Sequence, residues 1–356
     1  MNVRLSAVPL LFFSFSHAHA GDPASAKGIT IPQAASPWRI GGGYAQLFGL
    51  KAEFSGLGNF TSPFTAQPPG TGWERDYDNG FVHVDSSGNL GSETWNWSYD
   101  DASQYNPAGT GSIDFSITNS IANGHADDRG ASEPGFEFFA YRDMGQVDLN
   151  FIGDRKASWG FREGIQYSRM NMGNHDTIST GVSTTTDSFD LGGNVPPLAP
   201  YTGSFSGPGP LLGDVPTRSS VVSNSGLVSG QRELDVDLTV LSFGSYLAAP
   251  VTPKVDCLLE AGVSVGLADG SYHFTSETTI AGVGTRTSGG RTSDTDLLPG
   301  IYLGLGGTYQ VSDRFALIAS GRYQYMSDFE LETNHSQASL SFSSAFTVSI
   351  GAVFSF

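Results

Sequence analysis

Residues 338–356 read ASLSFSSAFTVSIGAVFSF, and apolar side chains recur at every second position through most of this stretch. The apolar face holds Leu340, Phe342, Phe346, Val348, Ile350, Ala352, Phe354 and Phe356, with Ser344 as its polar member. The other face consists mainly of serine, with threonine, glycine, alanine and valine. Because alternate residues of a β-strand point to opposite sides, the stretch predicts one long strand with an oily face and a small, polar face.

The composition of the polar faces indicates what surrounds the strands. In a soluble β-sandwich the oily face packs inward, and the outer face carries Lys, Glu and Asp. Here the polar faces hold mostly Ser, Thr, Gly and Asn with scattered charge. This combination is typical of strands whose oily face contacts lipid and whose polar face lines a crowded lumen.

The same alternation recurs along the rest of the chain. Counting the C-terminal strand, we expect about ten strands, within a range of eight to twelve. The other nine lie at residues 40–54, 95–99, 113–117, 136–141, 157–167, 234–240, 257–267, 301–309 and 315–329. Glu163 falls on the oily face of its strand, and nothing in the pattern explains this violation.

The connections between these strands are predicted to be asymmetric. One set is short, at residues 101–109, 144–156, 249–255 and 311–314. The other set is mostly long, at residues 55–90, 120–134, 173–230 and 275–295, with the short connection at residues 332–337 as the exception. Short periplasmic turns and long extracellular loops are typical of a single antiparallel, up-and-down transmembrane β-barrel. Such a barrel has no free edges and satisfies its backbone groups within hydrocarbon.

The N-terminal residues 1–20 predict a cleaved secretory signal peptide. Arg4 precedes an apolar run, and Ala18-His19-Ala20 forms a small-x-small cleavage site before Gly21. No later apolar run approaches the roughly 18 residues that a membrane helix needs. We therefore divide the chain into the signal peptide, an N-terminal periplasmic segment at residues 21–37 and an outer-membrane barrel at residues 38–356.

Composition excludes several classes of function. The 356 residues include 18 basic and 35 acidic side chains, for a net charge of −17, and one Cys. The acidity disfavours nucleic acid as a partner, because phosphate binding depends on Lys and Arg. A single Cys allows no disulfide within the chain and no Cys cluster for a metal. The sequence predicts no cofactor and no metal site.

The signal peptide, the repeated alternation and the C-terminal strand resemble those of Gram-negative outer-membrane β-barrel proteins, such as small porin-like barrels or barrels like outer membrane protein A. No subfamily signature accompanies this resemblance. It implies an integral location in the outer membrane, surrounded by its lipid. It also implies that the last strand is the signal shown to the barrel-insertion machinery, through Val348, Ile350, Ala352, Phe354 and Phe356.

Charged residues on the polar faces are predicted to line the lumen. They are Lys51, Glu53, Asp114, Glu137, Arg162, Glu233, Asp235, Asp237, Glu260, Arg322 and Asp328. A barrel of about ten strands is narrow enough for side chains to fill, so one prediction is a plugged barrel with internal ion pairs. The alternative is a narrow, cation-preferring pore bordered by the surplus acids Glu233, Asp235 and Asp237.

Candidate chemistry in the outer loops is sparse. Some outer-membrane barrels are hydrolases, which directs attention to His175-Asp176, His273 and His335-Ser336. Adjacent residues on a strand point to opposite faces, so the two dipeptides make poor catalytic pairs. Residues 76–80 resemble a calcium loop, but the order favours a hairpin turn at Asn79-Gly80. We therefore predict a non-enzymatic barrel with a structural or surface-interaction role. The cation-preferring pore is the second hypothesis, and a barrel hydrolase is the third.

Overall fold

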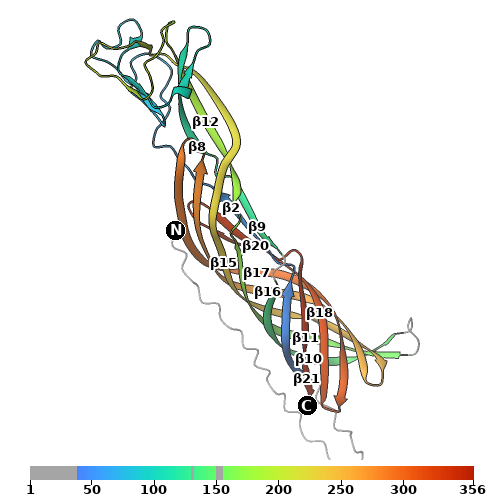
Figure 1. The fold of residues 1–356 in the computed structure, drawn as a ribbon. Coiled ribbons are helices and arrows are strands. Elements are labelled where there is room, and N and C mark those ends of the chain that lie inside the picture. The colour runs from blue at the N-terminus through green and yellow to red at the C-terminus, as the bar shows by residue number, and fades with distance from the viewer. Residues whose placement is uncertain (1–37, 130–131, 150–154) are drawn as a thin grey trace, which may run out of the picture. The chain divides into compact units, whose positions relative to one another are not determined.

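A closed ring of eight strands forms the base of the fold. The computed structural model describes residues 38–129, 132–149 and 155–356. Every neighbouring pair in the ring is antiparallel and hydrogen-bonded, and β21 pairs with β1 to close it (Figure 1). In order around the ring, the strands are β1 (Trp38–Phe48), β10 (Glu133–Leu149), β11 (Arg155–Asn174), β15 (Thr217–Thr252), β16 (Val255–Ile280), β17 (Gly284–Ser312), β18 (Phe315–Met326) and β21 (Ala345–Ser355).

The ring of eight lies within the predicted range but below the expected ten. Eight of the ten predicted stretches contribute its strands. The other two, at residues 95–99 and 113–117, form β6 (Trp97–Tyr99) and β8 (Ser112–Ser120), which are not ring members. Their apolar residues are buried in a separate cluster. Apolar and polar residues alternate in β6 and β8 because a strand that packs on a protein core also has one apolar face. The sequence pattern therefore did not distinguish strands that pack on a core from strands that face lipid.

Short connections gather at one edge of the ring. Residues 253–254 join β15 to β16, and residues 313–314 join β17 to β18. The predicted short turns at 249–255 and 311–314 are therefore confirmed. The short turn predicted at 101–109 is wrong, because those residues contain a 3-10 turn, η1 (Ala102–Gln104), and β7 (Tyr105–Asn106), which pairs with β8.

Within the part of the chain that the structure describes, no helical segment has the length and the hydropathy of a membrane-spanning helix.

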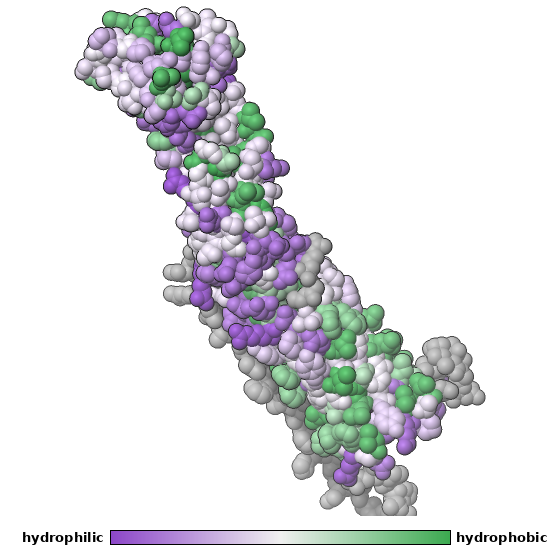
Figure 2. Space-filling model, viewed as in Figure 1, coloured by the Kyte–Doolittle hydropathy of each residue, from purple (hydrophilic) through white to green (hydrophobic). Residues whose placement is uncertain are grey.

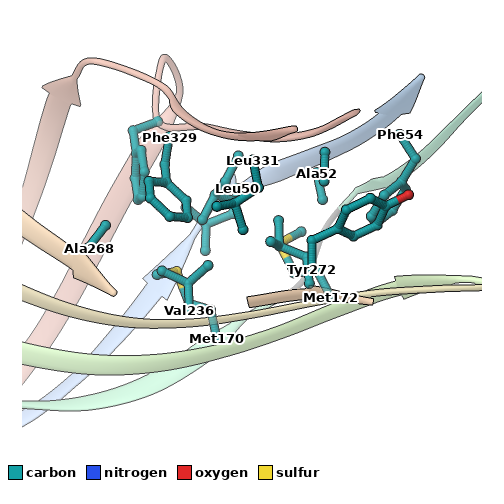
Figure 3. Close-up of a cluster of buried hydrophobic side chains, with 14 of the residues drawn as sticks. Leu50, Ala52, Phe54, Met170, Met172, Val236, Ala268, Tyr272, Phe329 and Leu331 are labelled. Carbon is teal, nitrogen blue, oxygen red and sulfur yellow. The ribbon is translucent and has the colours of Figure 1, made fainter. Parts of the chain in front are cut away.

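A second sheet lies beyond the opposite edge of the ring. Its four strands pair in the order β19 (Phe329–Glu332), β20 (Gln337–Ser341), β2 (Lys51–Leu57) and β9 (Gly124–Arg129). Apolar side chains of this sheet and of the upper parts of β11, β15 and β16 point toward one another (Figure 3). Figure 3 labels Leu50, Ala52, Phe54, Met170, Met172, Val236, Ala268, Tyr272, Phe329 and Leu331, all of them buried. We call this cluster the upper core.

The predicted loops at residues 120–134, 173–230 and 275–295 contain regular strands. Strands β16 and β17 pair as one long hairpin up to Ile280 and Gly284. The upper half of β15 leaves its pairing with β11 and pairs with β12 (Ile178–Asp190), which in turn pairs with β8. The 13 residues of β12 are mostly Ser and Thr and alternate weakly, which is why the pattern missed this strand.

The apolar residues of the ring strands switch from the outward face to the inward face partway along the strands. On β15, Leu241 and Phe243 point outward and are about half exposed, whereas Val236, Leu238 and Val240 are buried in the upper core. The backbone alternation continues unbroken through Val240 and Leu241. Consecutive residues point to opposite faces, so these two adjacent apolar side chains mark the switch.

The neighbouring strands show the same switch. On β16 the outward residues are Val263, Val265 and Leu267, followed by Asp269, Ser271 and His273 on the same face. On β17 they are Leu297, Ile301, Leu303 and Leu305, preceded by Ser293 and Thr295. We call the outward apolar zone below the switch the apolar band. On the face shown in Figure 2, hydrophobic side chains gather over the ring strands and a hydrophilic zone follows next to them.

The C-terminal strand is confirmed in its second half. Phe346, Val348, Ile350, Phe354 and Phe356 point outward and are exposed. Leu340 and Phe342, predicted on the same oily face, are instead fully buried in the upper core. Residues 343–344 form a turn that interrupts the alternation, so the nineteen-residue stretch is two strands, β20 and β21.

A similar break separates β1 from β2. Leu50 and Phe54 continue the outward series of Ile40, Tyr44 and Phe48 in the sequence pattern, yet both are buried in the upper core. Gly49, with φ +75°, ends β1, and a Cβ at this position would lie 2.2 Å from the carbonyl oxygen of Ser344. Only glycine fits this left-handed, closely packed turn, and it changes the face on which the following residues lie.

Candidate functional site

The interior of the ring at the level of the apolar band holds four buried charges. Arg162 Nη2 lies 3.2 Å from Glu137 Oε2, and Arg162 Nε lies 3.5 Å from Glu260 Oε2. Arg322 Nη2 lies 3.3 Å from Glu137 Oε2 and 3.7 Å from Glu260 Oε2. All four side chains are at most 5% exposed. Two cations and two anions balance, as buried charges require. We call this group the charged quartet.

Aromatic side chains enclose the quartet. The Tyr141 hydroxyl donates to Glu260 Oε1 at 2.5 Å. The Arg162 guanidinium lies 5.0 Å from the centre of the Phe139 ring, and that of Arg322 lies 5.3 Å from the centre of the Tyr302 ring. Guanidinium groups are attracted to the faces of aromatic rings, so these contacts help to compensate for the water that the arginines have lost.

Apolar clusters fill the ring on both sides of the quartet. The upper core lies toward the second sheet. Toward the short turns lies a smaller cluster, the lower core, made of Phe139, Tyr141, Tyr246, Ala248, Leu258, Ile318 and Val353. Tyr246 of this cluster lies inside the ring and is 2% exposed. Side chains from both clusters and the quartet pack the interior at three successive levels.

The predicted lumen residues separate into two groups. Arg162, Glu260 and Arg322 lie inside the ring and come together with Glu137. Glu233, Asp235 and Asp237 lie on the outward face of β15, because the residues that alternate with them are buried in the upper core. Their predicted place in the lumen is wrong, and the cause is the switch at Val240 and Leu241. Asp237 instead accepts a hydrogen bond of 2.5 Å from the Tyr167 hydroxyl on the outside.

The remaining predicted lumen residues lie outside the ring strands. Lys51 and Glu53 belong to β2, pair with each other and face away from the upper core. Asp114 belongs to β8 and accepts a hydrogen bond of 2.6 Å from Ser188 Oγ. Asp328 is exposed in the connection between β18 and β19. The predicted lumen position of these four residues is therefore wrong, because the segments that carry them are not part of the ring.

A separate module with its own core is formed by residues between β2 and β9 and by residues from the end of β12 to the start of β15. We call residues 60–118 and 185–218 the head. Its strands form a four-stranded sheet, β13 (Tyr201–Thr202), β6, β4 (Gly80–Val82) and β3 (Arg75–Tyr77), and a pair, β14 (Leu212–Gly213) with β5 (Glu93–Thr94). The buried core of the head consists of Tyr77, Val82, Trp97, Tyr99, Ile113, Phe115, Ile117, Phe189, Leu191 and Leu212.

Buried polar contacts hold the two head segments together. The Arg75 guanidinium is 1% exposed and donates to the carbonyl oxygens of Gly70 at 2.6 Å and Asp214 at 3.1 Å. Asp187 accepts from the Tyr77 hydroxyl and from Arg218, each at 2.7 Å. Burial and these contacts with Asp187 raise the pKa of Tyr77, so its hydroxyl stays protonated and donates. The bonds from Arg75 to Asp214 and from Tyr77 to Asp187 join residues more than 100 positions apart and connect the two segments of the head.

Hydrogen bonds also order the loop that follows β4. Asp85 Oδ1 accepts from the backbone N–H and the hydroxyl of Ser87, and Asp85 Oδ2 accepts from the backbone N–H of Trp95. Burial opposes ionisation of Asp85, but these hydrogen bonds outweigh it and hold the pKa of its carboxyl below the ordinary value. A carboxyl with a lowered pKa stabilises the folded loop at neutral pH, and the stabilisation is lost only as pH falls through that pKa.

The candidate catalytic and metal residues do not assemble in the described part of the chain. His175, His273 and His335 are exposed, and within the described residues His335 alone of these three makes a side-chain hydrogen bond, with Asn59 at 3.0 Å. Ser336 Oγ instead contacts the Tyr272 hydroxyl at 3.0 Å. Residues 78–79 form the turn between β3 and β4, which confirms the predicted hairpin near Asn79-Gly80. No cluster of three metal-ligating side chains occurs among the described residues.

The sequence matches no protein-family model and no curated protein. Among solved structures, the chain is similar to the attachment invasion locus protein Ail of Yersinia pestis, with 9% identity over 88% of this chain and 99% of that chain and a TM-score of 0.26. It is also similar to the outer membrane protease OmpT from Escherichia coli, with 10% identity over 92% and 100% and a TM-score of 0.34. At these values the similarities support no inference about activity or partner.

The class of protein follows from the structure itself. A closed ring of antiparallel strands leaves no unpaired edge in hydrocarbon, and an outward apolar band provides the surface that lipid requires. The chain has the architecture of the outer-membrane β-barrels of Gram-negative bacteria. This confirms the class of protein that the sequence resemblance implied. The outward residues Val348, Ile350, Ala352, Phe354 and Phe356 of the predicted insertion signal belong to this band. The predicted signal peptide with Ala18 and Ala20, and the segment 21–37, lie outside the described residues.

Proposed function

We propose that the chain is a plugged, non-enzymatic outer-membrane barrel whose role is to hold the head outside the cell for contact with a partner. The observation that supports this best is the filled ring, in which the charged quartet lies between two apolar cores. Strand β15 continues past the apolar band and pairs there with β12, which pairs with β8 of the head. We therefore infer an anchor with a display module rather than a conduit.

The surface chemistry of the head favours a particular kind of partner. The head contains eleven Asp and Glu against two Arg, and both arginines are bound within it. Large apolar side chains are also exposed on it, namely Trp73, Leu90, Val195, Leu198, Phe205, Leu211 and Val215. Acidic surroundings with exposed apolar anchors suit a positively charged, partly apolar protein surface.

The cation-preferring pore is not supported. It depended on Glu233, Asp235 and Asp237 lining the lumen, and these residues lie on the outer face. The four buried charges inside the ring, Arg162, Arg322, Glu137 and Glu260, are paired with one another. We expect the refolded protein to show no steps of conductance in a planar lipid bilayer. Regular, cation-selective steps would contradict the proposal.

A labelling control establishes that the tested protein is inserted and oriented. Leu198 is 93% exposed on the head, and Asp313 is exposed in the turn between β17 and β18. In a Cys257→Ser background, a membrane-impermeant maleimide should label Leu198→Cys on intact cells and Asp313→Cys only after the outer membrane is permeabilised. Labelling of Asp313→Cys on intact cells would reverse the orientation and refute display of the head outside.

A further inference from the structure

Glu163 interrupts the apolar band on the outside of the ring. It lies on β11 between the outward aromatic residues Trp159 and Tyr167, and it is exposed. Across the strands it is paired with Ala140 of β10 and Phe243 of β15. Glu163 lies midway along the outward-facing residues of β11. We therefore infer that its carboxylate lies at the level of the hydrocarbon core of the membrane.

The structure provides no partner for this carboxylate. Among the described residues, Glu163 makes no hydrogen bond and no ion pair within 4.0 Å. It borders a shallow hollow of about 400 Å³ in the outer wall, whose other outward members are Ile40, Phe138, Ala140, Ile165 and Leu241. A charged group facing lipid is unfavourable, and an ionisable residue within a membrane span usually has a specific partner.

Arg142 is the outward cation nearest in register to this hollow. It lies on β10 two residues from Ala140, one diagonal step from Glu163. Diagonal neighbours in an antiparallel pair are about 7–8 Å apart. The Arg142 guanidinium is turned toward the Trp38 ring, 5.4 Å from its centre, and not toward Glu163. The outer surface of β10 and β11 around Glu163 and Arg142 therefore presents one unpaired anion and one cation side by side. We call this surface the patch.

We propose that this patch of β10 and β11 is the interface between two copies of the chain in the membrane. A two-fold axis normal to the membrane apposes the same patch of both copies. Glu163 of each copy then meets Arg142 of the other, and both charges leave the lipid. Phe136 and Phe138, which are 60% and 65% exposed on β10, supply the aromatic contacts that usually dominate such interfaces.

Charge complementarity favours a second copy over lipid as the occupant. Acyl chains offer nothing to a carboxylate, whereas the patch is complementary to itself under two-fold rotation. The inference rests on the membrane placement proposed above, so the test begins with protein recovered from the outer-membrane fraction. Absence from that fraction would refute the placement, and it is thereby distinguished from failure of the interface.

The test compares charge reversals at the two positions. In mild detergent, sedimentation should show a dimer for the natural chain, and Glu163→Arg or Arg142→Glu should weaken the dimer by roughly tenfold or more. The double variant, with both charges exchanged, should restore it. In the Cys257→Ser background, Phe138→Cys should form a cross-linked dimer in native membranes. Leu303→Cys, which is equally outward on β17, should not.

Three results would overturn the proposal. The first is a monomer in every variant with no cross-link at Phe138→Cys. The second is a dimer that neither reversal affects. The third is a change in thermal stability on charge reversal with no change in oligomeric state, which would show that Glu163 interacts with Arg142 of its own chain. A lipid-facing Glu163 would also make Glu163→Leu more stable than the natural chain, and an interface predicts the opposite.

Discussion

Replacing Arg162 by methionine is expected to lower the free energy of unfolding by about 3–5 kcal/mol. Arg162 contacts both Glu137 and Glu260 inside the ring, where its side chain is 1% exposed. Its removal leaves two buried carboxylates against the single cation Arg322. An uncompensated buried charge costs far more than the methionine gains by packing. Chemical denaturation of the barrel refolded into lipid vesicles measures the difference.

Two variants separate this effect from a general loss of an arginine. Arg169 lies on the outer face of the same strand and is exposed, so Arg169→Met should change stability by no more than about 0.5 kcal/mol. Adding Glu137→Gln to Arg162→Met leaves one anion and one cation, and should recover part of the loss. If Arg162→Met were as mild as Arg169→Met, the quartet would not be the buried, balanced group described here.

A lysine in the apolar band is expected to destabilise the barrel by about 2–4 kcal/mol, the cost of a cation facing the middle of the bilayer. Val263→Lys places it on the outward face of β16, at a position that is 57% exposed. Thr275 lies on the same face of the same strand above the switch, so Thr275→Lys should cost no more than about 0.5 kcal/mol. In a soluble protein both exposed positions would accept lysine. Equal tolerance would therefore contradict a lipid-facing band.

The membrane band was predictable because alternation over the ring strands is simple and continuous. The outward series on β21, from Phe346 to Phe354, was predicted residue by residue. The switch to the upper core was not predicted, although adjacent apolar residues such as Val240-Leu241 are its signal. A period of two reports which residues share a face, and it does not report whether that face meets lipid or a core. The same ambiguity placed Glu233, Asp235 and Asp237 in the lumen.

The charged quartet was predictable only in part. Arg162, Glu260 and Arg322 stood on polar faces of clear strands, but their pairing with Glu137 depends on strand register across the ring. The head escaped the pattern because its core combines two segments separated by more than 60 residues. Its short strands and its polar, proline-rich stretch at 191–216 look like loops until the two segments are brought together.

The central claim is that the oily side of the ring strands faces lipid below the switch and the protein interior above it. Nitroxide labels at Val263→Cys and Thr275→Cys, in the Cys257→Ser background, test it on one face of one strand. In reconstituted vesicles, the label at Val263 should collide with dissolved oxygen and be shielded from a water-soluble nickel complex, and the label at Thr275 should show the reverse. Access of the nickel complex to both labels, or shielding of both, would contradict the account.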